Sequence, residues 1–198
     1  SWTASAGAVN YVLEVYTDAG RTIPVSGSPF TVASPTVSYA VSGLNPGTTY
    51  YYQIKATNAL CSSTYLLGSA TTIVVPPSNN ECANATTLPC GTSNLAGTTV
   101  NASSYTHGSG CTMSNYGVWY TFTGNGAQNV ISVTTTGFDV EMSISSGTCG
   151  ALTSITCQDV AFSNGTETYT FNTTLGTTYY VYIAHWDAAG TTTGSFTI

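Results

Sequence analysis

The sequence predicts an all-β protein built as two tandem antiparallel β-sandwiches. Only 5% of its 198 residues are charged, against about 25% in an average soluble protein. Thr, Ser, Asn and Gly supply most of the polar surface; they suit strands and turns, while strong helix formers such as Lys, Glu and Arg are scarce. Short runs of alternating apolar and polar residues recur between Gly, Pro, Asn and Ser clusters, which is typical of antiparallel strands.

A boundary between the two sandwiches is expected at the segment VVPPSNNECANA, residues 74–85. Pro76-Pro77 stiffens the chain, and the Ser and Asn residues that follow favour turns. Cysteine density and charge both change here. We therefore expect a first domain over residues 1–76 and a second over residues 77–198.

The charge distribution excludes some classes of partner. The net charge is −6, and the only basic residues, Arg21 and Lys55, lie before the boundary. A second half with six acidic and no basic residues cannot neutralise phosphates, so neither nucleic acid nor an anionic membrane surface is an expected partner. No run of about 18 apolar residues occurs, so membrane insertion through a helix is not expected.

In the first half, strands are expected over residues 1–5, 11–17, 36–43 and 49–58. The last is the clearest, because Tyr50, Tyr52, Ile54 and Ala56 fall on one apolar face. In the second half, strands are expected over residues 117–124, 129–136, 138–147, 167–174 and 177–187. There Phe138, Val140, Met142 and Ile144 share one face.

The run Leu44-Asn45-Pro46-Gly47-Thr48-Thr49-Tyr50, together with Trp2, resembles fibronectin type III domains. The resemblance covers residues 1 to about 75. It implies a sandwich in which Trp2 belongs to the core and Tyr50 forms a tyrosine corner. It also implies a first strand before Ser1, which is missing.

A missing strand would leave a sheet edge and the core beside Trp2 open, and open edges recruit other strands. The strand that occupies this edge is expected to come from one of two sources: the preceding residues of a longer parent chain, or a neighbouring copy in a filament.

Residues 79–198 resemble the bacterial pre-peptidase C-terminal domain, through the motifs NNECANA, VWYTFTG and FDVEMSISSGTCG and the closing stretch from Leu175. This resemblance implies a β-sandwich from a secreted bacterial protein. Paired with a fibronectin-type module, it is similar to large surface proteins of Bacteroidetes. We therefore expect a non-catalytic structural or adhesive module at the cell surface, whose partners are other copies or neighbouring modules. The alternative is an accessory carbohydrate- or protein-binding module of a secreted hydrolase.

The phrase Gly-Thr-Thr-Tyr-Tyr occurs twice, from Gly47 and from Gly176. Gly permits a tight turn before each strand, the Thr residues begin the strand, and the first Tyr, Tyr50 or Tyr179, packs across the sandwich corner. Because the flanking residues differ, we interpret the repetition as convergent turn chemistry.

Six cysteines in an acidic, Thr-rich chain favour an oxidising compartment. Cys149 and Cys157 flank a hairpin-like segment, and a disulfide between them is predicted. Cys82 and Cys90 are spaced to close a second one, although Cys82–Cys111 and Cys90–Cys111 stay open as alternatives. Cys61 stands alone in the first half; it is free, or pairs between chains or outside this sequence.

Calcium is the one metal for which the sequence offers ligands, and no other cofactor is expected. Asp139 and Glu141 lie two residues apart on one strand face, and Asp159 follows in an acidic loop. Calcium prefers several carboxylate and carbonyl oxygens. The alternative is a solvated acidic face.

Residues 177–187 carry two aromatic rows. One holds Tyr179, Val181 and Ile183, and the other holds Tyr180, Tyr182 and Trp186. One row must be core; Tyr180, Tyr182 and Trp186 are then candidates for a binding stripe able to stack on sugar rings or hold a protein partner. The alternative places that row under a loop or a neighbouring domain.

No motif of a nucleophilic or metal-dependent enzyme is present, and the chain has only two histidines, His107 and His185. His185 and Asp187 lie at a strand end, where a structural role is expected. The sequence therefore predicts a protein that is not an enzyme.

Overall fold

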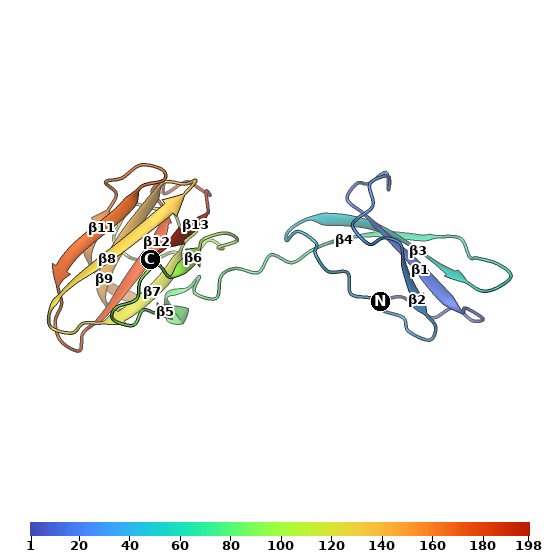
Figure 1. Ribbon diagram of the computed structural model, residues 1–198, viewed down its shortest axis with the longest axis horizontal. Coiled ribbons are helices and arrows are strands. Elements are labelled where there is room, and N and C mark those ends of the chain that lie inside the picture. The colour runs from blue at the N-terminus through green and yellow to red at the C-terminus, as the bar shows by residue number, and fades with distance from the viewer. The chain divides into compact units, whose positions relative to one another are not determined.

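The computed structural model describes residues 1–198 and divides into two compact units, Ser1–Val74 and Val75–Ile198 (Figure 1). Both units are built from β-strands, and the fold class is all-β with antiparallel sheets. The single helix, η1 (Cys82–Asn84), is one short 3₁₀ turn. No helix has the length and apolar character needed to cross a membrane.

The first unit contains one four-stranded antiparallel sheet in the order β2-β1-β3-β4 (Figure 1). Its strands are β1 (Asn10–Tyr16), β2 (Phe30–Ala33), β3 (Thr49–Thr57) and β4 (Leu66–Thr71). Alternation along β1 and β3 buries one face, which carries Tyr11, Leu13, Val15, Tyr50 and Ile54. The predicted apolar face of residues 49–58 is thereby confirmed.

The layer opposite this sheet is extended chain without a strand ladder. Residues 1–5 and 36–43, both predicted as strands, form no strand, and this part of the prediction is wrong. The backbone N–H of Trp2 donates to the Val37 carbonyl at 2.9 Å. The side chains of Trp2, Val37, Val41 and Leu44 pack on the core. Apolar contact thus holds these segments in place, but one backbone bond does not make a ladder.

The second unit is a β-sandwich of two sheets (Figure 1). One has the order β10-β9-β12-β7-β5 and the other β11-β8-β13-β6. The strands of the first sheet are β5 (Thr86–Thr87), β7 (Val118–Thr123), β9 (Val140–Thr148), β10 (Ala151–Gln158) and β12 (Thr178–His185). Those of the second are β6 (Ala96–Thr98), β8 (Gln128–Thr136), β11 (Thr166–Asn172) and β13 (Ser195–Thr197).

The core between the two sheets comes from alternate residues of their inner faces. Phe138, Val140, Met142 and Ile144 lie in it together, as predicted, beside Val118, Tyr120, Phe122, Val133, Tyr179, Val181, Ile183 and Phe196. Burial of this apolar surface is the main stabilising contribution to the unit.

The outer face of the five-stranded sheet is also covered. Met113, Trp119, Tyr182, Ala184 and Cys82 form a second buried cluster there, capped by the segment that leads into β7. The Tyr182 hydroxyl donates to the Ser114 carbonyl at 2.9 Å, and its ring lies 4.7 Å from that of Trp119. The central strand β12 is therefore buried on both faces, which explains its continuous run of apolar and aromatic residues.

Each Gly-Thr-Thr-Tyr-Tyr phrase forms the same corner. The hydroxyl of Tyr50 accepts a hydrogen bond from the Asn45 N–H at 2.9 Å, and that of Tyr179 accepts one from the Thr174 N–H at 2.9 Å. Both tyrosines are buried. The glycine three residues earlier has a left-handed φ, 62° at Gly47 and 77° at Gly176. The predicted turn chemistry is confirmed in both units.

Candidate functional site

Two disulfides tie the second unit together, and neither is a predicted one. Cys82 pairs with Cys149, and Cys111 pairs with Cys157. The predicted Cys149–Cys157 bond is wrong because Cys149 lies in the turn between β9 and β10, where Thr148 pairs with Ala151. Cys157 lies near the other end of β10, opposite Ser143, so the two cysteines are most of a strand apart.

The predicted Cys82–Cys90 bond is also wrong, and so are the alternatives that joined Cys111 to either residue. Cys82 is buried on η1 and is bonded to Cys149, whereas Cys90 is an exposed free thiol. Cys61 is likewise free and exposed. Two disulfides within one unit are typical of an oxidising compartment.

The predicted calcium ligands lie on and beside the outer face of the five-stranded sheet. Glu141 is on β9 and is only 5% exposed, and Asp139 and Asp159 flank the ends of β9 and β10. Burial, together with the charges of Asp159 and Glu167, raises the pKa of Glu141 to about 7. Burial and the charge of Asp139 also raise the pKa of Asp159. The protonated forms of Glu141 and Asp159 are thus favoured by burial and by their acidic neighbours.

These three carboxylates do not converge as a calcium site would require. The one group of three possible ligand atoms within 4.8 Å of each other joins Glu141 to Cys111 and Cys157. Those two sulfurs are bonded to each other, so they are not free to ligate a metal. The donor set that surrounds Glu141 therefore does not fit calcium, which needs several oxygens.

Glu167 is a fourth carboxylate of this region and is not among the residues predicted from the sequence. It is fully buried on β11; one carboxylate oxygen accepts hydrogen bonds from the N–H groups of Val160 and Ala161, at 2.9 and 2.6 Å. The other oxygen is buried without a partner. A signal existed: Glu167 alternates with Tyr169 and Phe171, which pack on the core.

The predicted binding stripe is not an exposed surface. Tyr182 is completely buried, and Tyr180 is half-buried against the cluster around Trp119. Trp186 alone of the three is substantially exposed, at 47%. The prediction of a binding stripe is wrong for Tyr182, because the segment before β7 lies over this row.

The two histidines make structural contacts. His107 stacks on Tyr182 with ring centroids 4.7 Å apart, and its Nδ1 lies 2.7 Å from the Ser109 hydroxyl. Burial lowers the pKa of His107. His185 accepts the Asp187 N–H at its own Nδ1, at 3.2 Å, which holds the turn after β12.

The first unit carries an apolar groove that we call the Trp2 groove. It has a volume of about 550 Å³ and opens on the sheet face between the extended segments and β4. Trp2, Tyr39, Val41, Tyr52, Ile54 and Leu66 are among its lining residues. Tyr39 and Leu66 are exposed, and the indole N–H of Trp2 is buried without an acceptor.

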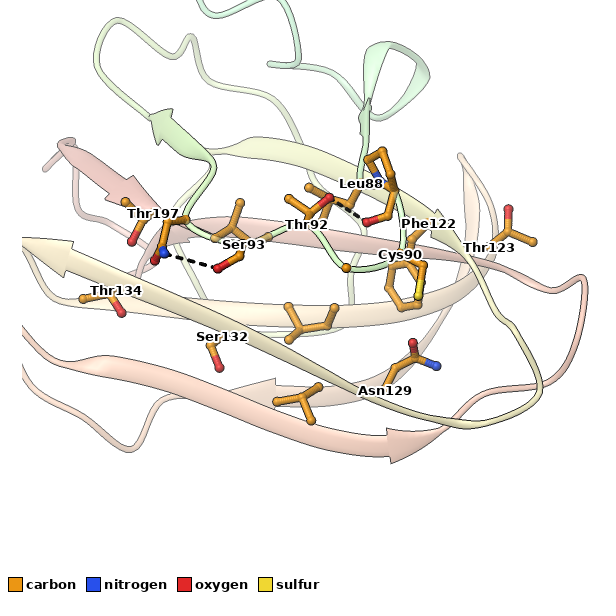
Figure 2. Close-up of a pocket in the computed structure, with 16 residues that line it drawn as sticks. Leu88, Cys90, Thr92, Ser93, Phe122, Thr123, Asn129, Ser132, Thr134 and Thr197 are labelled. Atoms are coloured by element: carbon orange, nitrogen blue, oxygen red, sulfur yellow. Dashed lines mark hydrogen bonds between the residues drawn. The ribbon is translucent and has the colours of Figure 1, made fainter.

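The second unit carries a different opening, which we call the β8 slot (Figure 2). It has a volume of about 290 Å³ and lies between the segment 88–94 and strand β8. Leu88, Phe122 and Ile131 line it together with hydroxyl and amide side chains such as Ser93, Asn129 and Ser132. Cys90 also lines it, and no charged residue does.

Backbone groups of β8 are free along this slot. Thr135 donates its N–H to Gly165 on the β11 side, so the odd-numbered residues of β8 face β11 and the even-numbered ones face away from it. On that other side, β13 pairs only with Thr134–Thr136. Val130 and Ser132 therefore present N–H and C=O groups that no other backbone group pairs with.

Comparison with known proteins gives this chain no family. No protein-family model matches it. No curated protein matches it either. The features that bear on function are therefore the groove, the slot and the buried carboxylates.

Of these features, the two openings offer apolar surface, and the β8 slot also offers unpaired backbone groups. Glu141, at the centre of the acidic region, is instead buried beside the Cys111–Cys157 disulfide. The sequence predicted an open core beside Trp2, and the Trp2 groove lies there. The β8 slot was not predicted, because it depends on which segments pair in three dimensions.

Proposed function

We propose that this protein is a non-catalytic structural or adhesive module of an extracellular bacterial surface protein or filament, and that the Trp2 groove is where a neighbouring copy docks. The observation that carries the proposal is the groove: an apolar sheet face that the unit's own chain covers only in part. Exposed apolar surface of this kind marks sites of protein interaction.

The chemistry of the groove supports a polypeptide partner. Leu66 is 65% exposed and Tyr39 is 44% exposed, and both line the groove, so their side chains are available for contact with a partner. Apart from the amino terminus at Ser1, the groove is lined by uncharged groups, so association should depend mainly on apolar burial and respond little to salt. The two disulfides are consistent with an oxidising environment outside the cytosol.

Self-association of the full chain tests the proposal. Leu66→Asp places a charge on the groove, and its matched control, Leu60→Asp, places one on a residue that is 95% exposed and outside the groove. In sedimentation velocity over a concentration series, we expect wild type and Leu60→Asp to associate and Leu66→Asp to remain monomeric. A Leu66→Asp variant that associates like wild type would contradict the proposal, as would a wild type that stays monomeric at every concentration.

A further inference from the structure

We infer that the Cys111–Cys157 disulfide is a thiol-exchange site, at which a small external thiol attacks the sulfur of Cys157 and the carboxyl group of Glu141 gives its proton to the departing sulfur of Cys111. The site lies in the second unit and is separate from the Trp2 groove. The inference therefore goes beyond the proposed function, and each can fail without the other.

The two halves of this disulfide differ in accessibility. Cys157 is exposed on β10, which is an edge strand of the five-stranded sheet. Cys111 is partly buried and packs against the cluster around Trp119. Disulfide exchange needs access of a thiolate to the sulfur that it attacks. The attack therefore falls on Cys157, and Cys111 is the leaving group.

The carboxyl group of Glu141 is placed to protonate that leaving group. One carboxylate oxygen lies within 4.8 Å of both sulfurs, and the side chain is only 5% exposed. When the S–S bond breaks, the Cys111 side chain is free to rotate toward this oxygen. Burial and nearby acidic groups raise the pKa of Glu141 to about 7, and a general acid acts best when its pKa lies near the ambient pH.

The surroundings of Cys111 favour a thiol over a thiolate. The Thr156 carbonyl oxygen lies 3.6 Å from the Cys111 sulfur, and the second half of the chain has no Lys or Arg. A carbonyl oxygen accepts a bond from an S–H group but repels a thiolate, which cationic neighbours normally stabilise. Cys111 therefore departs readily only if it is protonated as the bond breaks.

The titratable groups around this site come from several elements, and they are Asp139, Asp159, Glu167 and His185. Asp159, after β10, and Glu167, on β11, act directly on Glu141 and favour its protonated form. His185 acts on Asp159 instead. The remaining histidine, His107, has its Nδ1 within 2.7 Å of the Ser109 hydroxyl. Glu141 is thus the acid that lies beside both sulfurs.

The exchange conserves atoms, charge and electrons. The thiolate forms an S–S bond to Cys157, and the electron pair of the broken bond goes to the Cys111 sulfur, which takes the proton of Glu141. The products are a mixed disulfide at Cys157, a thiol at Cys111 and a carboxylate at Glu141. A second thiolate can then release Cys157, so that the external thiol is oxidised to its disulfide and the protein disulfide is reduced.

The second disulfide is an internal comparison. In Cys82–Cys149 one partner is buried and the other is exposed, much as in Cys111–Cys157. However, no carboxylate or histidine lies within 4.8 Å of both of its sulfurs. Because one thiol attacks both bonds in the same sample, the ratio of the two cleavage rates is independent of the reactivity of that thiol.

The probe is 2-mercaptoethanol, a small thiol without an acidic group, since the carboxylates around the site repel an anionic thiol. It is added to the full chain after Cys61 and Cys90 have been alkylated. Acid quenching, digestion with pepsin and mass spectrometry then give the cleavage rate of each disulfide and the position of the mixed disulfide. We expect the first mixed disulfide on Cys157. Above pH 7 the rate of Cys111–Cys157 cleavage relative to Cys82–Cys149 should fall by about tenfold per pH unit, as Glu141 loses its proton.

Glu141→Gln separates proton donation from charge repulsion, because Gln has neither a proton to give nor a charge. We expect this variant to lose Cys111–Cys157 at least about tenfold more slowly than wild type at pH 6, and Cys82–Cys149 at the wild-type rate. Glu81→Gln, which removes the carboxyl group next to Cys82 in the sequence, is the matched control and should change neither rate.

Several results would overturn the inference. If Glu141→Gln reacts at pH 6 as fast as wild type or faster, the carboxylate only repels the incoming thiolate. A first mixed disulfide on Cys111 would show that the leaving sulfur is the other one. Should Glu141→Gln fail to fold, the wild-type protein still decides: a ratio of the two rates that stays constant between pH 6 and pH 8 would exclude Glu141 as the proton donor.

Discussion

The carboxylate of Glu141 lies within 4.8 Å of the sulfur of Cys157, which is bonded to Cys111. A carboxyl group thus shares its buried site with a disulfide, and its other near neighbours, Asp159 and Glu167, are also acidic. The second unit has no Lys or Arg to compensate a charge there. The site accordingly favours the protonated form of Glu141.

This arrangement predicts a pH dependence of stability. The folded pKa of Glu141, about 7, lies above the ordinary value of 4.5, so between these values the folded protein binds more protons than the unfolded one. The contribution is fully present below about pH 4.5 and is lost as pH rises through 7. We expect the free energy of unfolding to fall by on the order of 2 kcal/mol over this range.

Glu141→Gln keeps the shape of the side chain and removes the charge. Urea denaturation at a series of pH values should show a flatter profile for this variant and greater stability than wild type at pH 8. Glu81→Gln, at an exposed position, is the matched control and should retain the wild-type slope. A Glu141→Gln profile that matches wild type would show that Glu141 is not the group responsible.

Peptide mapping without reduction tests the disulfide pairing. Chymotrypsin suits the experiment, because the chain after Lys55 contains no site for trypsin. We expect linked peptides for Cys82–Cys149 and Cys111–Cys157, with Cys61 and Cys90 open to alkylation. Replacing either bonded pair by Ala should lower the free energy of unfolding by roughly 2–4 kcal/mol, since each bond closes a long loop. A peptide that joins Cys149 to Cys157 would contradict the structure.

The tyrosine corners should each contribute measurably to stability. Tyr50→Phe and Tyr179→Phe remove the hydroxyl that accepts a backbone N–H and leave that donor without its partner. We expect a loss of about 1 kcal/mol in each case. Tyr39→Phe, an exposed tyrosine without such a bond, should change stability by less than about 0.5 kcal/mol. Equal effects of all three in denaturant titrations would argue against a role for the corner.

Gly117 marks the place where the covering segment meets the five-stranded sheet. A Cβ atom at this position would lie 2.5 Å from the Ile183 carbonyl oxygen, a backbone atom that cannot rotate away. Gly117→Ala should therefore destabilise the second unit by about 1–3 kcal/mol. Thr112→Ala, at an exposed position of the same segment, is the control. Thermal unfolding that is unchanged in Gly117→Ala would show that the segment does not pack closely against the sheet at this position.

We also expect no hydrolytic activity from the chain. A screen with peptidase, esterase and glycosidase substrates is the measurement. Turnover that disappears in His107→Ala or His185→Ala would contradict the proposal of a non-catalytic module.

The features that follow from local sequence were predictable. The alternation of Tyr50, Tyr52 and Ile54 identified β3 and its buried face, and the two Gly-Thr-Thr-Tyr-Tyr phrases identified both corners. Strands β7, β8, β9, β11 and β12 also appear close to the expected ranges.

The features that depend on long-range pairing were not predictable. Cys149 and Cys157 seemed close because they are near in sequence, yet a hairpin places residues opposite each other according to its turn. Tyr182 was predicted to be exposed because nothing in the local sequence indicates that the segment before β7 covers it. Short strands such as β6 and β13 exist only through their partners.

The two disulfides also bear on how the second unit responds to pulling. Cys82–Cys149 and Cys111–Cys157 overlap along the chain, so everything between Cys82 and Cys157 is cross-linked. Under tension applied at both ends, the closed loops that contain β7, β8 and β9 cannot be drawn out. Only the residues before Cys82, the short stretch around β10 and the strands after Cys157 can lengthen. Beyond that extension covalent bonds bear the load, and reduction of the two disulfides would convert a short tether into a much longer one.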